Sequence, residues 1–307
     1  MDDIYLKNVT IKFKNNLIID NVNVNFYRNQ VTALVGESGS GKSVLGMSIL
    51  KLLPKYAGIE GECYLGNKDL WSYSSDINAI RGSEIGLILQ NAGEALNSII
   101  KIRKQGCEPL RIKREIDNTE AHEILTELLS KLGFSDVERI MGSYPCELSG
   151  GMNQRVLIGM GLAYGPKWII VDEPTKGLDA VLRKKTYALF DFIKKDFQSS
   201  MIIITHDLEL AEILSDRVVV MYKGKIVEQG RTEDVFTNPK HPYTQGLLKA
   251  LPKRGMKPIL KCNNERVSGC LFYNYCPFIK KKCREKIPNP IKIGDTAEVS
   301  CFLYDKD

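Results

Sequence analysis

The stretch VGESGSGKS, from Val35 to Ser43, has residue types and spacing suited to holding phosphate groups. It fits the pattern G-x-x-x-x-G-K-[ST], whose glycines let backbone N–H groups approach phosphate oxygens. Lys42 would bring a mobile positive charge to the β- and γ-phosphates of ATP, and the Ser43 hydroxyl would hold Mg²⁺. The residues expected to contact the phosphates are Gly36, Glu37, Ser38, Gly39, Ser40, Gly41, Lys42 and Ser43.

The context of this loop supports the interpretation. It follows the apolar run VTALV and precedes KSVLGMSILKLL, whose leucines and isoleucine recur at helical spacing. A strand, a glycine-rich loop and a helix in that order direct the positive end of the helix at a bound anion.

Two acidic residues follow the apolar run WIIV in the stretch WIIVDEP. Asp172 would hold Mg²⁺, directly or through water, and Glu173 would polarise the water that attacks the γ-phosphate. The alternative is that these acidic residues only begin a helix, where the helix dipole favours negative charge.

The stretch ELSGGMNQRV, Glu147 to Val156, resembles the LSGGQ signature of ATP-binding-cassette (ABC) ATPases, with Met152 in the last place. The resemblance implies a second anion site at a helix N-terminus, made by the Ser149 side chain and the backbone N–H groups of Gly150 and Gly151. In that family the site closes on the ATP held by the phosphate loop of a second subunit, so ATP joins two subunits and its hydrolysis releases them.

Three further motifs stand in the order that this family has. Gln90, in LILQN, resembles the Q-loop glutamine that links the metal site to the membrane partner, and KGLD, ending at Asp179, resembles the D-loop. His206, in IIITHD, resembles the switch histidine that contacts the γ-phosphate. The family usually stacks an aromatic residue on adenine; Phe13 is the nearest candidate, but core packing accounts for it equally well.

Short apolar runs predict an α/β fold. VTALV, IGLIL, WIIVD, MIIIT and VVVMY are typical of parallel strands buried on both faces, while IYLKNVTIKF and NVNVNFY alternate as half-exposed antiparallel strands do. With the resemblance, which covers Ile4 to Phe236, this predicts a P-loop NTPase with a RecA-like parallel sheet and an antiparallel β subdomain. We expect an ATP-binding domain at 1–236, a helical insert at about 94–164, and a small cysteine-rich extension at 237–307.

The charge of the chain is uneven. Of 307 residues, the first 250 carry 31 basic and 31 acidic side chains, whereas residues 251–307 carry 12 and 6. The basic tail is either a solvated surface or one that faces nucleic acid, acidic lipid or an anionic cluster. No apolar run is long enough to cross a bilayer and the start, MDDIYLK, lacks the layout of a signal peptide, so we expect a cytoplasmic protein.

The cysteines fall into two groups. Cys63, Cys107 and Cys146 are expected to be ordinary thiols. The tail contains four cysteines with five, six and seventeen residues between them, which leaves a [4Fe–4S] cluster, a Zn²⁺ ion, or plain thiols or a disulfide as alternatives. The four are Cys270, Cys276, Cys283 and Cys301; Cys262 stands outside this pattern.

The tail also indicates a subfamily. KHPYTQGLLKALP and GCLFYNYCPFIKKKCREKIP resemble the C-terminal extension of the ATPase subunits of dipeptide and oligopeptide ABC importers. The resemblance favours the [4Fe–4S] cluster and implies an ATPase at the cytoplasmic face of the cell membrane that powers import of short peptides. Its partners would be a second ABC ATPase subunit, two transmembrane permeases and an extracellular solute-binding protein, with no nucleic acid.

Two other functions fit the same motifs. The ATPase of a nickel or metal-chelate importer belongs to the same subfamily, and the loose Q-loop text GLILQNAGEALN is compatible with it. A soluble ABC ATPase acting on ribosomes, DNA or cluster assembly is the alternative of another class. The single cassette and the lack of a heptad run argue against that alternative.

Overall fold

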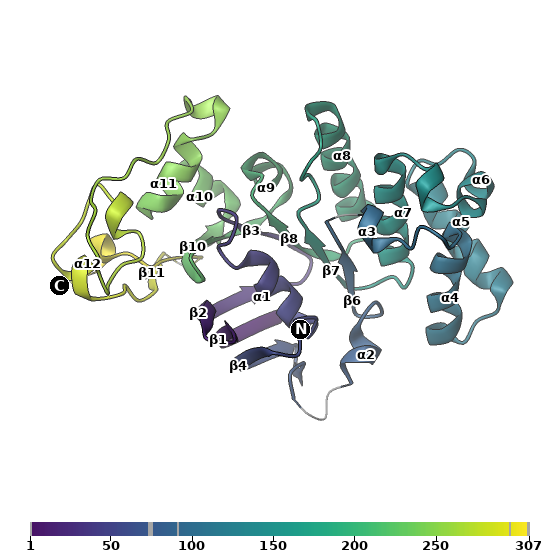
Figure 1. Ribbon diagram of the computed structural model, residues 1–307, viewed down its shortest axis with the longest axis horizontal. Coiled ribbons are helices and arrows are strands. Elements are labelled where there is room, and N and C mark those ends of the chain that lie inside the picture. Colours follow the sequence, from purple (N-terminus) through teal and green to yellow (C-terminus); the bar gives the residue numbers. More distant parts are fainter. Residues whose placement is uncertain (1, 73–75, 91, 295, 306–307) are drawn as a thin grey trace. The chain divides into compact units, whose positions relative to one another are not determined.

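A computed structural model describes residues 2–72, 76–90, 92–294 and 296–305 (Figure 1). Its contacts divide the chain into two compact units. The first unit comprises Met1–Ser75 and Ile202–Asp307, and the second comprises Asp76–Met201.

The first unit contains an antiparallel sheet with the strand order β2-β1-β4-β5. Alternation in the sequence turns Ile4, Leu6, Val22 and Val24 into the core, so the two predicted strands are confirmed. The third long strand was not predicted, because its glycines and glutamates obscure the alternation. The strands are β1 (Ile4–Phe13), β2 (Asn16–Phe26), β4 (Ala57–Leu65) and β5 (Lys68–Asp69).

The larger sheet of this unit runs β11-β12-β10-β9-β3-β8. The pair β3 and β9 is parallel and almost wholly buried, as the apolar runs predict. At the other edge, β12 pairs antiparallel with β10, so the C-terminal tail extends the sheet. The strands are β3 (Val31–Val35), β8 (Ser200–Thr205), β9 (Arg217–Tyr222), β10 (Lys225–Arg231), β11 (Ile291–Ile293) and β12 (Ala297–Val299).

The helices of the first unit are α1 (Lys42–Ile49), α9 (Leu208–Leu214), α10 (Thr232–Thr237), α11 (Pro242–Lys249) and α12 (Lys282–Glu285). The helix expected after the phosphate loop exists but stops at Ile49, because Lys51 adopts a left-handed conformation with φ 51°. α11 belongs to the segment expected to form the extension, 237–307, but it packs into the core of the first unit. Tyr243 is fully buried in the same cluster as Val35 and Tyr222.

The second unit contains the parallel pair β6 (Ile85–Ile88) and β7 (Trp168–Asp172). Residues 94–164 are mostly helical, as expected, and α5 ends before Gly133, whose φ is 85°. None of the helices in the described ranges is both long and apolar enough to cross a bilayer. The helices are α2 (Ile77–Ile80), α3 (Ala92–Ala95), α4 (Ile102–Arg114), α5 (Asn118–Lys131), α6 (Val137–Gly142), α7 (Gly150–Leu162) and α8 (Ala180–Asp196).

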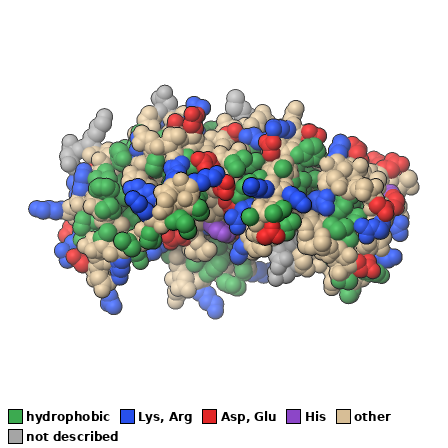
Figure 2. Space-filling model, turned by 90° about the horizontal axis from the view of Figure 1, so that it is seen from above, with side chains coloured by type: hydrophobic (Ala, Val, Ile, Leu, Met, Phe, Trp, Pro, Cys, Tyr) green, Lys and Arg blue, Asp and Glu red, His purple; other side chains and the backbone are tan. Residues whose placement is uncertain are grey.

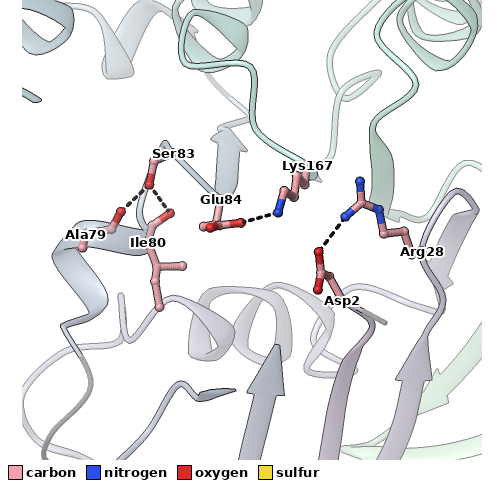
Figure 3. Close-up of polar contacts among 7 residues, drawn as sticks. All are labelled: Asp2, Arg28, Ala79, Ile80, Ser83, Glu84 and Lys167. Atoms are coloured by element: carbon pink, nitrogen blue, oxygen red, sulfur yellow. Dashed lines mark hydrogen bonds and ion pairs between the residues drawn. The ribbon is translucent and has the colours of Figure 1, made fainter. Parts of the chain in front are cut away.

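Ion pairs join neighbouring segments inside each unit (Figure 3). In the second unit Lys167, just before β7, pairs with Glu84, just before β6, at 3.5 Å, and Ser83 donates to backbone carbonyls of α2. In the first unit Arg28 pairs with Asp2 at 2.8 Å. Partly exposed pairs contribute about 0–1 kcal/mol each, so the apolar cores supply most of the stability.

The N-cap of α5 offers a test of this fold. The Asp117 carboxylate accepts a hydrogen bond from the Glu120 backbone N–H at 2.9 Å. Asp117→Ala should lower the free energy of unfolding by about 1 kcal/mol, because the N–H loses its partner, whereas Asp117→Asn should cost far less. Urea denaturation measures both, and equal losses would contradict the capping role.

Candidate nucleotide-binding site

The phosphate loop joins β3 to α1 and is packed tightly against its own unit. A Cβ added to Gly36, whose φ is 151°, would stand 2.2 Å from the Met221 carbonyl oxygen of β9. A Cβ on Gly41 would stand 2.5 Å from the Ile19 side chain of β2. Any side chain at these two positions would push the loop away from the strands, so glycine is required there.

Lys42 is 4% exposed and lies across the loop. Its Nζ donates to the carbonyl oxygens of Gly36, at 2.8 Å, and Glu37, at 2.9 Å. The ammonium therefore sits within the loop, where the sequence predicts that the phosphates bind.

The loop also fits an anionic ligand. The Ser40 hydroxyl is buried and has no hydrogen-bond partner among the described residues, a condition that costs about 1–3 kcal/mol. The helix that follows begins with Lys-Ser-Val-Leu, and no side chain caps its N-terminus within the described structure. Phosphate oxygens are suited to accept hydrogen bonds from both the hydroxyl and the first backbone N–H groups.

His206 belongs to the same unit and is exposed directly after β8. The turn around it is fixed, because the Asp207 carboxylate caps α9 and the Asp207 N–H donates to the Thr205 hydroxyl at 2.9 Å. The histidine is thus presented on a short, well-defined turn at the end of a buried strand.

The predicted metal and water ligands lie in the second unit, at the end of β7. Asp172 and Glu173 are each 8% exposed, and Glu173 has a left-handed backbone with φ 47°. That conformation costs a non-glycine residue about 1–3 kcal/mol and is common at functional sites. Gln90 lies in the same unit, exposed, two residues after β6.

The signature motif forms the start of α7. Ser149 is its N-cap, and the hydroxyl accepts from the Met152 N–H at 3.4 Å. A Cβ added to Gly150 or Gly151 would meet nothing within 4 Å in the part of the chain that the structure describes. Packing within the described chain therefore does not require glycine at these two positions. A ligand that comes close to the backbone would require it.

Two residues just after the signature were not predicted. Gln154 donates from Nε2 to the Pro174 carbonyl oxygen at 2.7 Å, which connects α7 to the turn that holds Glu173. Arg155 donates to the Gly133 carbonyl oxygen at the end of α5, and its guanidinium lies 4.3 Å from the centre of the Phe134 ring. The polar pair Gln154–Arg155, three and four residues after Gly151, was the available signal, and its role is to fix the signature helix to its neighbours.

The four tail cysteines line one small enclosed cavity of about 10 Å³ together with Phe272 and Tyr273. Burial raises the pKa of Cys270 and of Cys276 to about 11, with neighbouring thiols adding to the effect. Backbone N–H groups donate to the sulfurs of Cys276 and Cys283 at 3.4 Å. All eight cysteines are free thiols in this structure, and Cys262 is exposed outside the cavity.

Among the described residues, no group of three or more His, Cys, Asp or Glu side chains is placed to hold a metal ion. The surroundings are basic, with Lys280, Lys281 and Arg284 exposed next to the cavity-lining residues. Figure 2 shows blue Lys and Arg side chains at the end of the molecule that carries the tail.

Comparison with known proteins decides the family. A family model described as "ABC transporter" matches residues 19–176, and one described as "Oligopeptide/dipeptide transporter, C-terminal region" matches residues 227–283. The chain belongs to the ABC transporter ATPase family. The family predicted from the signature, and with it the P-loop NTPase fold, is confirmed.

Individual relatives and structures agree with this assignment. The ABC ATPase is 37% identical to the oligopeptide transport ATP-binding protein AppD of Bacillus subtilis, over 94% of this chain and 92% of AppD. It is 36% identical to the dipeptide transport ATP-binding protein DppD of the same organism, over 93% and 88%. Among solved structures, cbiO1 of Clostridium perfringens superposes with a TM-score of 0.66 at 27% identity, over 76% of this chain and 90% of cbiO1. The ATP-binding cassette MJ0796, solved as a dimer bound to ADP and Pi, superposes with a TM-score of 0.64 at 28% identity, over 75% of this chain and 98% of MJ0796.

The loop glycines give a test of the packing. Gly36→Ala should lower the free energy of unfolding by about 3 kcal/mol or more, because the new Cβ collides with a backbone carbonyl. Gly39→Ala is the control: its φ of 80° makes alanine strained by about 1–2 kcal/mol, but nothing described lies within 4 Å of the Cβ. Urea denaturation without nucleotide separates the two, and equal losses would contradict the close approach.

Proposed function

We propose that this ABC ATPase is the subunit that hydrolyses ATP to power import of short peptides through a multi-subunit transporter. The observation that carries the proposal is the match of residues 227–283 to the C-terminal region of oligopeptide and dipeptide transporters. The names of AppD and DppD, which align over nearly the whole chain, support it. Because both relatives are named for oligopeptide or dipeptide transport, nickel import is not adopted.

In this proposal the phosphate loop binds ATP. Lys42 leaves its two loop carbonyls for the β- and γ-phosphates, and the Ser40 hydroxyl gains an acceptor. Ser43 and Asp172 would hold Mg²⁺, which supplies positive charge to the phosphates when bound. Residues 36–43 present their backbone N–H groups to the same anion.

Hydrolysis would use three further residues that the sequence singles out. Glu173 orients the water whose oxygen attacks the γ-phosphorus, the bond to the β–γ bridging oxygen breaks, and ADP leaves. His206 would contact the γ-phosphate, and Gln90 would link the site to the membrane partner. The left-handed backbone of Glu173, held beside the Gln154–Pro174 hydrogen bond, supports a fixed direction for its carboxylate.

A second ATPase subunit would complete the site. Ser149, Gly150 and Gly151 would receive the γ-phosphate held by the partner's phosphate loop, and the open space above the two glycines supports this. A groove of about 740 Å³ beside them is lined by apolar Leu178 and Leu182. The dimeric state of the similar cassette MJ0796 also supports an ATP-bridged pair.

The remaining partners follow from the transporter. Two permeases would span the membrane, an extracellular solute-binding protein would deliver the peptide, and this ATPase would sit at the cytoplasmic face. The experiment is reconstitution with the permeases and the binding protein in vesicles. Di- to pentapeptides should stimulate ATP hydrolysis and enter the vesicles, whereas stimulation by nickel chelates alone would overturn the peptide assignment.

The signature glycines yield a sharper prediction. Gly151→Ala should leave stability unchanged or raise it by about 0.5 kcal/mol, because alanine restricts the unfolded chain more and nothing described obstructs its Cβ. It should nevertheless lower ATP hydrolysis by the assembled transporter about 10²-fold, the scale of losing a transition-state contact.

Gly142→Ala is the matched control for this change. Its Cβ also meets nothing within 4 Å of the described chain, but Gly142 ends α6, away from the signature. Hydrolysis should stay at the unmodified rate in this variant. An unchanged rate in Gly151→Ala would remove the second anion site from the mechanism.

We also propose that Cys270, Cys276, Cys283 and Cys301 hold a [4Fe–4S] cluster. Their shared cavity, the N–H donors to two sulfurs and the basic surroundings support it. Cys270 and Cys276, whose thiol pKa values are raised by burial, would lose their protons to bind iron, and the positive iron ions would offset the thiolate charge that burial disfavours.

Anaerobic purification tests the cluster. The full chain should contain about four iron atoms and absorb broadly in the visible range. Cys276→Ser should lose most of the iron, while Cys262→Ser, at an exposed cysteine outside the cavity, should retain it. Zinc in place of iron, or no metal in an intact chain, would refute the cluster.

A further inference from the structure

Tyr243 links the C-terminal segment to the phosphate loop. It is the second residue of α11, its ring is fully buried, and its hydroxyl oxygen accepts a hydrogen bond from the Glu37 backbone N–H at 3.0 Å. Glu37 is the second residue of the loop and stands 206 positions earlier in the chain. We propose that Tyr243 is a positioning residue of the nucleotide site, and that its hydroxyl holds the phosphate loop in the shape that binds ATP.

The start of α11 is held firmly enough for this role. The buried Glu228 carboxylate of β10 accepts from the backbone N–H groups of Lys240, at 2.6 Å, and His241, at 2.9 Å. His241 then accepts at Nδ1 from the Tyr243 N–H at 3.0 Å. Burial lowers the pKa of His241 to about 3, so the imidazole is neutral and one ring nitrogen can accept. The backbone of Tyr243 is thereby fixed to the sheet.

The ring is fixed as well. Its centroid lies 4.5 Å from that of Tyr222 on β9 and 5.5 Å from that of Phe272, and Phe272 also lines the cysteine cavity. From the end of the tail, the Tyr304 hydroxyl donates to the Lys240 carbonyl oxygen at 3.2 Å. Aromatic contacts of this kind restrict the ring to one position, which aims the hydroxyl at the loop.

The loop residue itself is held from two sides. The Tyr243 hydroxyl oxygen accepts a hydrogen bond from the Glu37 N–H, and the Lys42 ammonium donates to the Glu37 carbonyl oxygen at 2.9 Å. The Ser40 backbone N–H, inside the loop, also donates to that carbonyl oxygen at 3.1 Å. When Lys42 turns to a phosphate, its contact with Glu37 is lost, and the bond to the Tyr243 hydroxyl still ties residue 37 to the buried α11. A loop that is already ordered loses less conformational entropy on binding, so the hydroxyl should strengthen nucleotide binding.

Tyr243→Phe tests the proposal because it removes the hydroxyl and keeps the ring. Calorimetry on the full chain should show MgATP binding weakened about three- to tenfold, the scale of one hydrogen bond. In the reconstituted transporter the KM for ATP should rise by the same factor while kcat stays within about twofold. The amide hydrogen of residue 37 should exchange faster with solvent in the variant. A general loss of core packing would instead speed exchange at many amides.

Tyr222→Phe is the matched control. It removes a hydroxyl from the same aromatic cluster but leaves the bond between Tyr243 and Glu37 in place. MgATP binding should stay at the unmodified value. Equal or tighter binding by Tyr243→Phe, or the same loss in both variants, would overturn the proposal. The test needs only ATP binding, so its failure is distinguishable from failure of the peptide-import proposal, which leaves ATP binding untouched.

Discussion

The close contact between the phosphate loop and its supporting strands is the constraint on which the nucleotide site depends. At Gly36 the loop backbone passes so near the β9 carbonyl of Met221 that no Cβ fits, and at Gly41 it lies against β2. The loop is therefore packed against strands of two sheets, β9 and β2, and these contacts define its shape without a bound nucleotide. Lys42 lies across the loop, and the buried Ser40 hydroxyl, which has no hydrogen-bond partner in the described part of the chain, is available to a ligand.

Much of this was predictable from local sequence. Strands buried on both faces are unbroken apolar runs in the sequence, so β3, β7, β8 and β9 were predicted correctly. The phosphate loop has a residue spacing that its backbone geometry requires, so its position between β3 and α1 was predicted as well. β4 was not predicted, because Gly58, Gly61 and its glutamates interrupt the alternation of apolar and polar residues. The segment has little strand propensity of its own and forms a strand by pairing with β1.

What local sequence could not show is contact between distant positions. No periodicity connects Tyr243 with Glu37 or Gln154 with Pro174, since these pairs depend on packing of separate elements. The burial of α11 could not be predicted for the same reason. Pro242 begins this helix, and Pro239 precedes the turn that Glu228 holds through the Lys240 N–H, a contact between distant positions.

The tail illustrates how a small segment obtains a defined structure. Its own cluster of buried residues is only Tyr273, Cys283 and Phe302 among those described, too few to fold alone. It relies instead on pairing of β12 with β10 and on Phe272, which joins the aromatic cluster of the core. A bound cluster would add to these contacts and would not replace them.

Glu173 has a different kind of consequence. Its left-handed backbone is one that asparagine and glycine adopt far more readily than glutamate does. In the proposed mechanism Glu173 orients the attacking water, yet its backbone conformation is one that glutamate adopts at a cost of about 1–3 kcal/mol. Replacement by asparagine or glycine would therefore relieve backbone strain and remove the proposed carboxylate. On this proposal, a cassette of the same fold that has lost hydrolysis is expected to have a residue that favours the left-handed conformation at this position.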